Sequence, residues 1–157
     1  MYDSYSAARI REPLQLIPPV SSDPQGTDES ERHPEAQRGV RQRVLVVEDE
    51  YLLSVVLTTD LQQAGYEVLG PCATLATALE AAQAQSFDGA ILDINLRGEL
   101  VYPVAEELAR RGIPFLFLSG YAQLNIPEGL RSHPRLAKPA EWPVLLREVQ
   151  ALLRVKS

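Results

Sequence analysis

The sequence has few of the residues that stabilise small proteins through disulfides or structural metals. It contains one cysteine, Cys72, and two histidines among 157 residues. One cysteine cannot form an internal disulfide, and so few cysteines and histidines argue against a zinc site. We therefore expect a chain that folds on a hydrophobic core and resides in a reducing compartment.

Long hydrophobic runs and clusters of basic residues are also missing. Apolar runs such as 44–47 and 115–118 are far shorter than the ~20 residues that cross a bilayer. The N-terminal segment carries Arg9, Arg11 and Glu12 and has no apolar stretch typical of a signal peptide. The net charge of −6, without a basic stripe, argues against direct nucleic-acid binding. The sequence predicts a cytoplasmic protein that makes no membrane contact.

The composition changes near residue 40. Apolar residues make up 12 of the first 40 positions, but 59 of the 117 positions from 41 to 157. The first segment is rich in proline, serine and acidic residues, so it buries too little apolar area to offset the entropy of ordering. We predict that residues 1–40 form a disordered tail and that residues 41–157 form one domain. The apolar stretch 14–20 is either part of a solvated extension or a docking motif.

From residue 43 onward, short apolar runs alternate with helical patterns, as in βα units built on a parallel sheet. The predicted strands are 44–48, 66–69, 89–93, 114–118 and 135–137. Their runs are almost entirely apolar, which is typical of strands covered by helices on both faces. The pattern predicts an α/β, flavodoxin-like (βα)5 fold with a doubly wound, five-stranded parallel sheet.

Helical spacing and end signals place four helices between and after these strands. The first has an apolar stripe of Leu53, Val56, Leu57, Leu61 and Ala64 and ends at Gly65, and Thr74 caps the second. Pro103 lies in the first turn of the third, and the last runs from Trp142 to Leu153. Pro127 and Gly129 interrupt the segment between the fourth and fifth strands. We therefore expect the fourth helix of the fold to be short or irregular.

Polar residues follow the apolar strands at the points where the strands end. Glu48, Asp49 and Glu50 follow the first strand, Asp93 ends the third, Ser119 and Gly120 follow the fourth, and Lys138 follows the fifth. In a parallel sheet these positions meet at one edge. Crowded carboxylates raise one another's pKa unless a cation lies among them, and Mg²⁺ prefers such oxygen ligands. Taken alone, residues 48–50 could equally be a solvated acidic turn at the start of a helix.

Phosphoryl transfer is the chemistry that this residue set favours. An aspartate beside Mg²⁺ can attack a phosphoryl group and form an acyl phosphate. The Lys138 ammonium would neutralise the phosphoryl oxygens, and the Ser119 hydroxyl would donate a hydrogen bond to one of them.

Four motifs in order resemble the receiver domain of two-component response regulators: Val-Leu-Val-Val-Glu-Asp-Glu, Ile-Leu-Asp-Ile-Asn-Leu, Phe-Leu-Ser-Gly-Tyr and Ala-Lys-Pro. The resemblance covers residues 43 to about 155. It implies that Asp93 accepts a phosphoryl group from a phosphohistidine on a sensor kinase or a histidine phosphotransfer protein.

The same resemblance assigns the remaining roles in the site. It implies that Glu48, Asp49, Asp93 and the backbone carbonyl of Asn95 hold Mg²⁺. Ser119 and Lys138 would sense the phosphoryl group, the Lys138–Pro139 peptide is often cis in the family, and Gly120 would leave room for the phosphodonor. The side chains at 95 and 121 flank the phosphoryl group in the family and tune its hydrolysis.

The sequence departs from most receivers at two places. Arg135 stands where an aromatic switch residue is usual, while Tyr121 follows Ser119-Gly120, so the stretch 113–121 resembles a single-domain subgroup with a Phe-x-x-Thr/Ser-Gly-Tyr signature. We hypothesise that phosphorylation orders residues 119–134, with Tyr121 changing position. The loop 95–99 lacks the usual proline, so we expect it to have its own conformation.

Two other functions use similar residues. Phosphatases of the haloacid dehalogenase type also combine an aspartate nucleophile with Ser, Lys and Mg²⁺, but their nucleophile follows the first strand, and Asn95 removes their second carboxylate. A receiver-like module that binds proteins without phosphorylation is the remaining alternative. We expect no output domain and no activity beyond self-catalysed phosphorylation and dephosphorylation, so that output passes through an unknown downstream protein or a phosphorelay.

Overall fold

A computed structural model describes residues 40–120 and 125–154 of the chain. Its main sheet has five parallel strands in the order β2-β1-β3-β6-β7, which is the flavodoxin-like order. The strands are β1 (Arg43–Val47), β2 (Glu67–Cys72), β3 (Gly89–Asp93), β6 (Phe115–Ser119) and β7 (Arg135–Ala137). The order reverses direction between β1 and β3, and the predicted fold class is confirmed.

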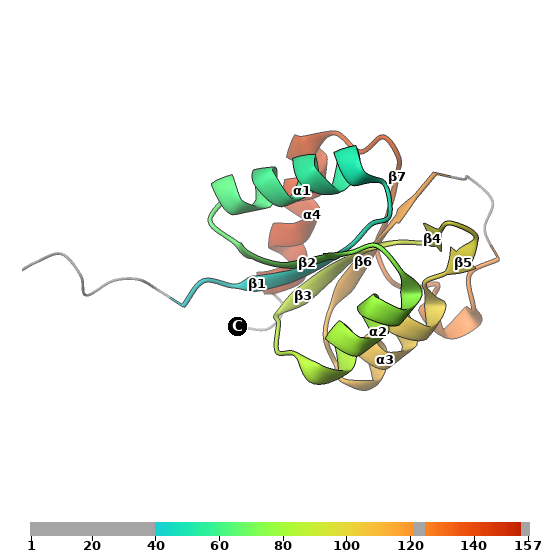
Figure 1. The fold of residues 1–157 in the computed structure, drawn as a ribbon. Helices are drawn as coiled ribbons and strands as arrows, with labels where there is room; N and C mark the ends of the chain where they lie inside the picture. Colours follow the sequence, from blue (N-terminus) through green and yellow to red (C-terminus); the bar gives the residue numbers. More distant parts are fainter. Residues whose placement is uncertain (1–39, 121–124, 155–157) are drawn as a thin grey trace, which may run out of the picture. The chain divides into compact units, whose positions relative to one another are not determined.

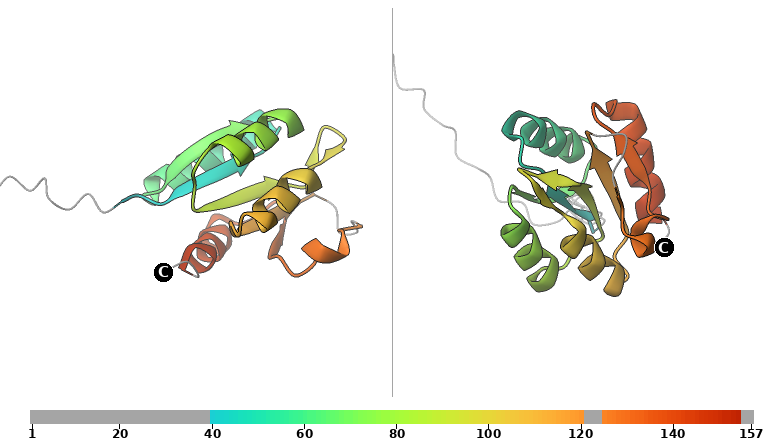
Figure 2. Two further views of the ribbon diagram at one scale, coloured as in Figure 1. Left: turned by 90° about the horizontal axis from the view of Figure 1, so that it is seen from below. Right: turned by 90° about the vertical axis from the view of Figure 1, so that its right-hand side faces the viewer.

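Helices cover both faces of this sheet. α1 (Tyr51–Gln63) and α4 (Trp142–Arg154) lie on one face, and α2 (Leu75–Ala84) and α3 (Tyr102–Arg110) lie on the other, as Figure 1 and the end-on view of Figure 2 show. Among the described residues, no helix has both the length and the apolar character that crossing a membrane requires.

The central strands β1, β3 and β6 are apolar along most of their length because each face of the sheet packs against its own core. Val44 and Val46 of β1 belong to the core under α1 and α4, whereas Leu45 and Val47 belong to the core under α2 and α3. Successive side chains of a strand point to opposite faces, so a strand buried on both faces needs apolar residues at every position.

The predicted end signals of the helices are present. The hydroxyl of Thr74 accepts a hydrogen bond from the Thr77 backbone N–H at 3.2 Å and so caps α2. Pro103 lies in the first turn of α3, where its missing N–H leaves no helical bond unmade. Gly65 follows the end of α1 with a φ of 95°, a left-handed conformation that favours glycine.

The segment between β6 and β7 is irregular, as predicted. Its described residues contain only the short 3₁₀ helix η1 (Glu128–Leu130), and Ile126 and Leu130 anchor this segment in the core under α2 and α3. Tyr121 lies outside the described residues, as does nearly all of the predicted tail, so these expectations stay predictions.

A two-stranded hairpin follows β3 and was not predicted. β4 (Asn95–Leu96) pairs antiparallel with β5 (Glu99–Leu100) through a two-residue turn at Arg97 and Gly98. Both turn residues have positive φ, at 53° and 96°, which matches the right-handed twist of a tight hairpin. The loop 95–99, which lacks the usual proline, forms this hairpin.

The apolar stripe predicted for the first helix does not follow the buried face of α1 at Val56 and Ala64, because both residues are exposed. Leu57 and Leu61 are buried against the sheet together with Ser54, but 55% of Val56 is exposed. Ser54, Leu57 and Leu61 are three and four residues apart and define the inward face of the helix. Val56 precedes Leu57 by one residue, which turns it by about 100° onto the flank of the helix.

Two glycines with the same backbone conformation provide a test of the sheet geometry. Gly65 and Gly70 both have a φ of 95°, but only at Gly70 would an added Cβ meet backbone, at 2.7 Å from Val46 O and 2.8 Å from Cys72 N. We expect Gly65→Ala to lower the free energy of unfolding by about 1 kcal/mol and Gly70→Ala by about 3 kcal/mol, because only the second adds a steric clash to the strained φ. Urea unfolding measures both, and equal costs would contradict the clash.

Candidate functional site

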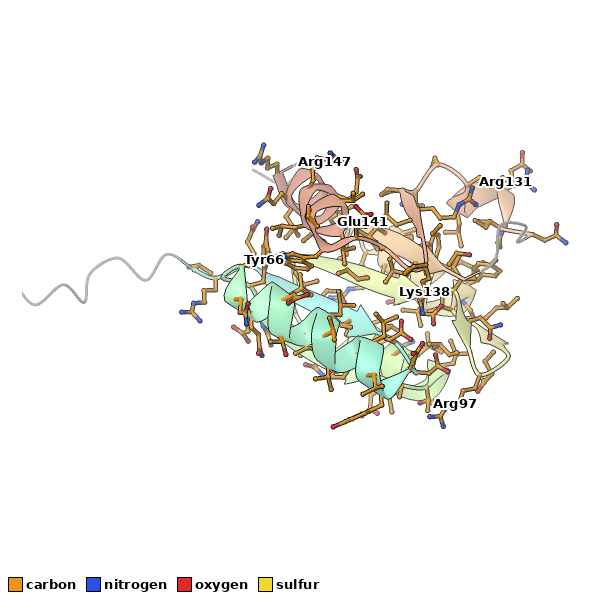
Figure 3. All side chains as sticks on the ribbon, turned by 90° about the horizontal axis from the view of Figure 1, so that it is seen from above. Tyr66, Arg97, Arg131, Lys138, Glu141 and Arg147 are labelled. Carbon is orange, nitrogen blue, oxygen red and sulfur yellow. The ribbon has the colours of Figure 1, made fainter. Side chains whose placement is uncertain are left out.

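The polar residues that follow the strands meet at one edge of the sheet. Glu48 and Asp49 lie directly after β1, Asp93 ends β3, Ser119 ends β6 and Lys138 follows β7. All of them except Glu48 line a cavity of about 320 Å³, which is lined by Asp49, Asp93, Ile94, Asn95, Arg97, Gly98, Ser119, Gly120 and Lys138. Figure 3 shows Lys138 and Arg97 at the same end of the domain, far from Tyr66.

Lys138 holds two of the carboxylates together. Its ammonium Nζ donates to Glu48 Oε2 at 2.6 Å and to Asp93 Oδ2 at 2.7 Å. The other oxygen of each carboxylate accepts a backbone N–H, that of Glu50 for Glu48 and that of Asn95 for Asp93. Glu48 and Asp93 are both buried, so these bonds replace the hydration that the two charges lose.

Burial and ion pairing have opposing effects on the pKa values of Glu48 and Lys138. Burial raises the pKa of Glu48, the nearby charge of Asp93 adds to the increase, and the bonds from Lys138 and Glu50 only partly offset it. Burial alone would lower the pKa of Lys138, but its hydrogen bonds to Asp93 and Glu48 outweigh burial, and the pKa is raised. The lysine therefore stays protonated at neutral pH.

The three carboxylates fit a divalent metal ion. Glu48, Asp49 and Asp93 each offer one oxygen, and these oxygens lie within 4.8 Å of one another. Lys138 neutralises only one of the three negative charges, so a surplus of negative charge remains at the site. Mg²⁺ takes carboxylate oxygens together with water and phosphate oxygens, and the cavity beside Asp49 and Asp93 is open for such ligands. Asn95, the fourth predicted ligand residue, lines the same cavity.

The remaining predicted residues surround the same cavity. Ser119 is buried, and its backbone carbonyl accepts the Lys138 N–H at 2.8 Å, which ties the end of β6 to the lysine. Gly120 is exposed, and an added Cβ there would meet no described atom within 4 Å. The fold itself therefore does not require glycine at position 120. The Lys138–Pro139 peptide is cis, as the family resemblance implies.

Sequence reasoning missed three residues that line the cavity, Ile94, Arg97 and Gly98, of which only Arg97 carries a charge. Its guanidinium Nε lies 3.7 Å from Asp49 Oδ2, and the side chain lines the cavity from the β4–β5 hairpin. The signal that could have found it is the pair Arg97-Gly98, because a glycine-containing dipeptide between two short strands predicts a tight hairpin. Because this hairpin begins two residues after Asp93, its turn residues Arg97 and Gly98 lie beside the cavity.

The domain is similar to known receiver domains in sequence and in structure. No family model matches the chain. The solution structure of SdrG from Sphingomonas melonis is 38% identical, with a TM-score of 0.63 over 72% of this chain and 97% of that one. The receiver domain of a Pseudomonas aeruginosa sensor histidine kinase, solved with magnesium coordinated in its active-site cleft, is 26% identical, with a TM-score of 0.59 over 73% and 98% of the two chains.

One curated protein is also similar to this chain in sequence. The transcriptional regulatory protein PdtaR of Mycobacterium tuberculosis is 30% identical over 104 residues, which is 66% of this chain and 51% of that protein. The chain thus spans about half the length of the curated relative that it matches. Together with the strand order, these similarities show that the described domain has the fold of response regulator receiver domains.

The ion group around Lys138 predicts an unequal response to substitution. Lys138→Ala leaves two buried carboxylates facing each other, so in metal-free buffer we expect the free energy of unfolding to fall by about 2–3 kcal/mol. Glu48→Gln in the same chain removes one of the two charges and should restore part of the loss. Chemical unfolding of the single and double variants measures this, and a double variant no more stable than Lys138→Ala alone would contradict the repulsion.

Proposed function

We propose that this chain is a single-domain response regulator, of the subgroup with the Phe-x-x-Thr/Ser-Gly-Tyr signature, that accepts a phosphoryl group on Asp93 in a Mg²⁺-dependent reaction. The observation that carries the proposal is the position of Asp93. This carboxylate is buried at the end of β3, within hydrogen-bonding distance of Lys138, and beside two further carboxylates that suit a metal ion.

The residues of the cavity support each step of this transfer. A carboxylate oxygen of Asp93 attacks the phosphorus of a phosphohistidine, an O–P bond forms, the N–P bond breaks, and its electron pair returns to the imidazole. Lys138 and Ser119 both line the cavity, and we expect the Lys138 ammonium and the Ser119 hydroxyl to donate to the phosphoryl oxygens. Mg²⁺, held by Glu48, Asp49, Asp93 and the Asn95 carbonyl, would neutralise the charge that gathers there.

The reverse of activation uses the same atoms. Water attacks the phosphorus, the O–P bond to Asp93 breaks, and inorganic phosphate leaves while the carboxylate is restored. Both reactions are self-catalysed, and we propose no other enzymatic activity. Asn95 and Tyr121 are the residues proposed to set the rate of this hydrolysis, and Gly120 to admit the phosphodonor.

Protein partners supply and receive the signal in this proposal. The donor is a sensor histidine kinase or a histidine phosphotransfer protein in the cytoplasm, and the output is an unknown downstream protein or a phosphorelay. An apolar groove of about 480 Å³ between α1 and α4, which includes Leu52 and Val56, supports contact with a donor protein because it also reaches Lys138. A donor seated there would have its phosphohistidine near Asp93.

Phosphorylation by a small donor tests the proposal. Intact-mass analysis after incubation with Mg²⁺ and phosphoramidate or acetyl phosphate should show one added phosphoryl group. The addition should be absent with EDTA and in Asp93→Asn. If beryllofluoride also left amide exchange of residues 119–134 unchanged, a missing mass gain would favour the phosphorylation-independent binding module.

The metal assignment has a separate test. Glu48→Gln combined with Asp49→Asn should abolish phosphorylation while the domain stays folded, because the substitutions remove ligands and also relieve repulsion between carboxylates. Glu106→Gln, on the exposed side of α3, removes a carboxylate away from the site and serves as the control. Normal phosphorylation of the double variant would show that these two residues do not hold the metal.

A further inference from the structure

Arg97 occupies a backbone position that arginine seldom takes. It is the first central residue of the two-residue turn between β4 and β5, with a φ of 53°, and it is the only residue other than glycine with positive φ among the described residues. Asn-Gly is the preferred pair for such a turn, because asparagine tolerates the left-handed conformation. A strained residue held by its surroundings is a frequent feature of functional sites.

The hairpin that carries Arg97 is fixed to the site. The Gly98 backbone N–H donates to Asn95 Oδ1 at 2.6 Å, and the Asn95 N–H in turn donates to the phosphoacceptor Asp93. The guanidinium projects from this support toward Asp49, with Nε 3.7 Å from Oδ2. The side chain of Arg97 is 74% exposed, so it has the freedom to change partners within the cavity that it lines.

The cations of the site divide the carboxylates between them. Three acidic side chains form the cluster at this site. Lys138 pairs with Glu48 and Asp93, and Arg97 pairs with Asp49. The Arg97 guanidinium therefore pairs with Asp49, the carboxylate with which Lys138 makes no ion pair. A divalent ion bound to all three carboxylates would approach Asp49 from the same cavity and would repel the guanidinium.

Charge balance assigns Arg97 a second partner. Three carboxylates are neutralised by Lys138 together with a divalent ion, so Arg97 is surplus in the metal-bound site. Phosphorylation replaces the single charge of Asp93 by a phosphoryl group of about two negative charges, and one further cation is then required. A guanidinium suits this position because it donates two parallel hydrogen bonds to phosphoryl oxygens.

We propose that Arg97 is a positioning residue that changes partners during signalling. It pairs with Asp49 and competes with Mg²⁺ in the unphosphorylated site, and it moves to the phosphoryl oxygens once Asp93 is modified. This inference rests on the proposed phosphorylation of Asp93, but its first half concerns only metal binding.

Substitution of Arg97 by asparagine tests both halves, because asparagine fits the turn and removes the charge. Calorimetric titration with Mg²⁺ alone should show that R97N binds the ion about twofold to fivefold more tightly than the chain without substitutions. The reason is that R97N loses an exposed ion pair that competes with the metal. Titration with beryllofluoride, a phosphoryl mimic, at saturating Mg²⁺ should show binding about fivefold weaker. R97K keeps the charge, so its affinity for Mg²⁺ should lie within about twofold of that of the chain without substitutions.

The control is R147Q, which removes an exposed arginine from α4, at a distance from Arg97 in Figure 3. Unchanged titrations for R147Q and opposite shifts for R97N would support the inference. Equal shifts in R97N and R147Q, or no shift in R97N, would overturn it while the phosphorylation of Asp93 stood. If the unmodified chain bound neither Mg²⁺ nor beryllofluoride and gained no phosphoryl mass, the proposed function would fail instead, and this inference with it.

Discussion

The pairing of Lys138 with Glu48 and Asp93 is the interaction on which the geometry of the site depends. It joins the loop after β1, the end of β3 and the loop after β7, which are separate in the sequence. Two buried carboxylates would repel each other in the absence of this ammonium, and the backbone N–H groups of Glu50 and Asn95 complete their hydrogen bonding. The arrangement keeps the Asp93 side chain buried and fixed in position.

The topology of the sheet explains why the site lies where it does. β1 and β3 are neighbours at the position where the strand order reverses, and the connections after them leave toward opposite faces. The carboxyl ends of these strands are therefore open to solvent, although the strands themselves are covered on both faces. Acidic residues at this edge displace little apolar surface from the core. Apolar strands and a charged site can therefore lie within a few residues of each other.

Much of this architecture could be predicted from the sequence because it depends on local composition. Apolar strands with polar residues at their ends predicted both the sheet and the convergence of Glu48, Asp49, Asp93 and Lys138. Arg97 and Val56 could not be placed in the same way. The direction of the Arg97 side chain depends on the positive φ angles in the turn between β4 and β5, and each of these strands has only two residues. The exposure of Val56 depends on how α1 is rotated about its own axis. Neither property is encoded in hydrophobic periodicity alone.

The alternation of β1 between the two cores has a consequence for the acidic residues that follow it. Val44 and Val46 face one layer of helices, and Leu45 and Val47 face the other. A shift of one residue in the pairing of β1 would keep an apolar residue at nearly every position, but it would exchange the faces and carry Asp49 to the place of Glu48. The longer glutamate would then no longer meet the lysine. The packing of the four aliphatic residues 44–47 thus fixes the register of β1. That register determines that Glu48 is buried and that Asp49 faces the cavity.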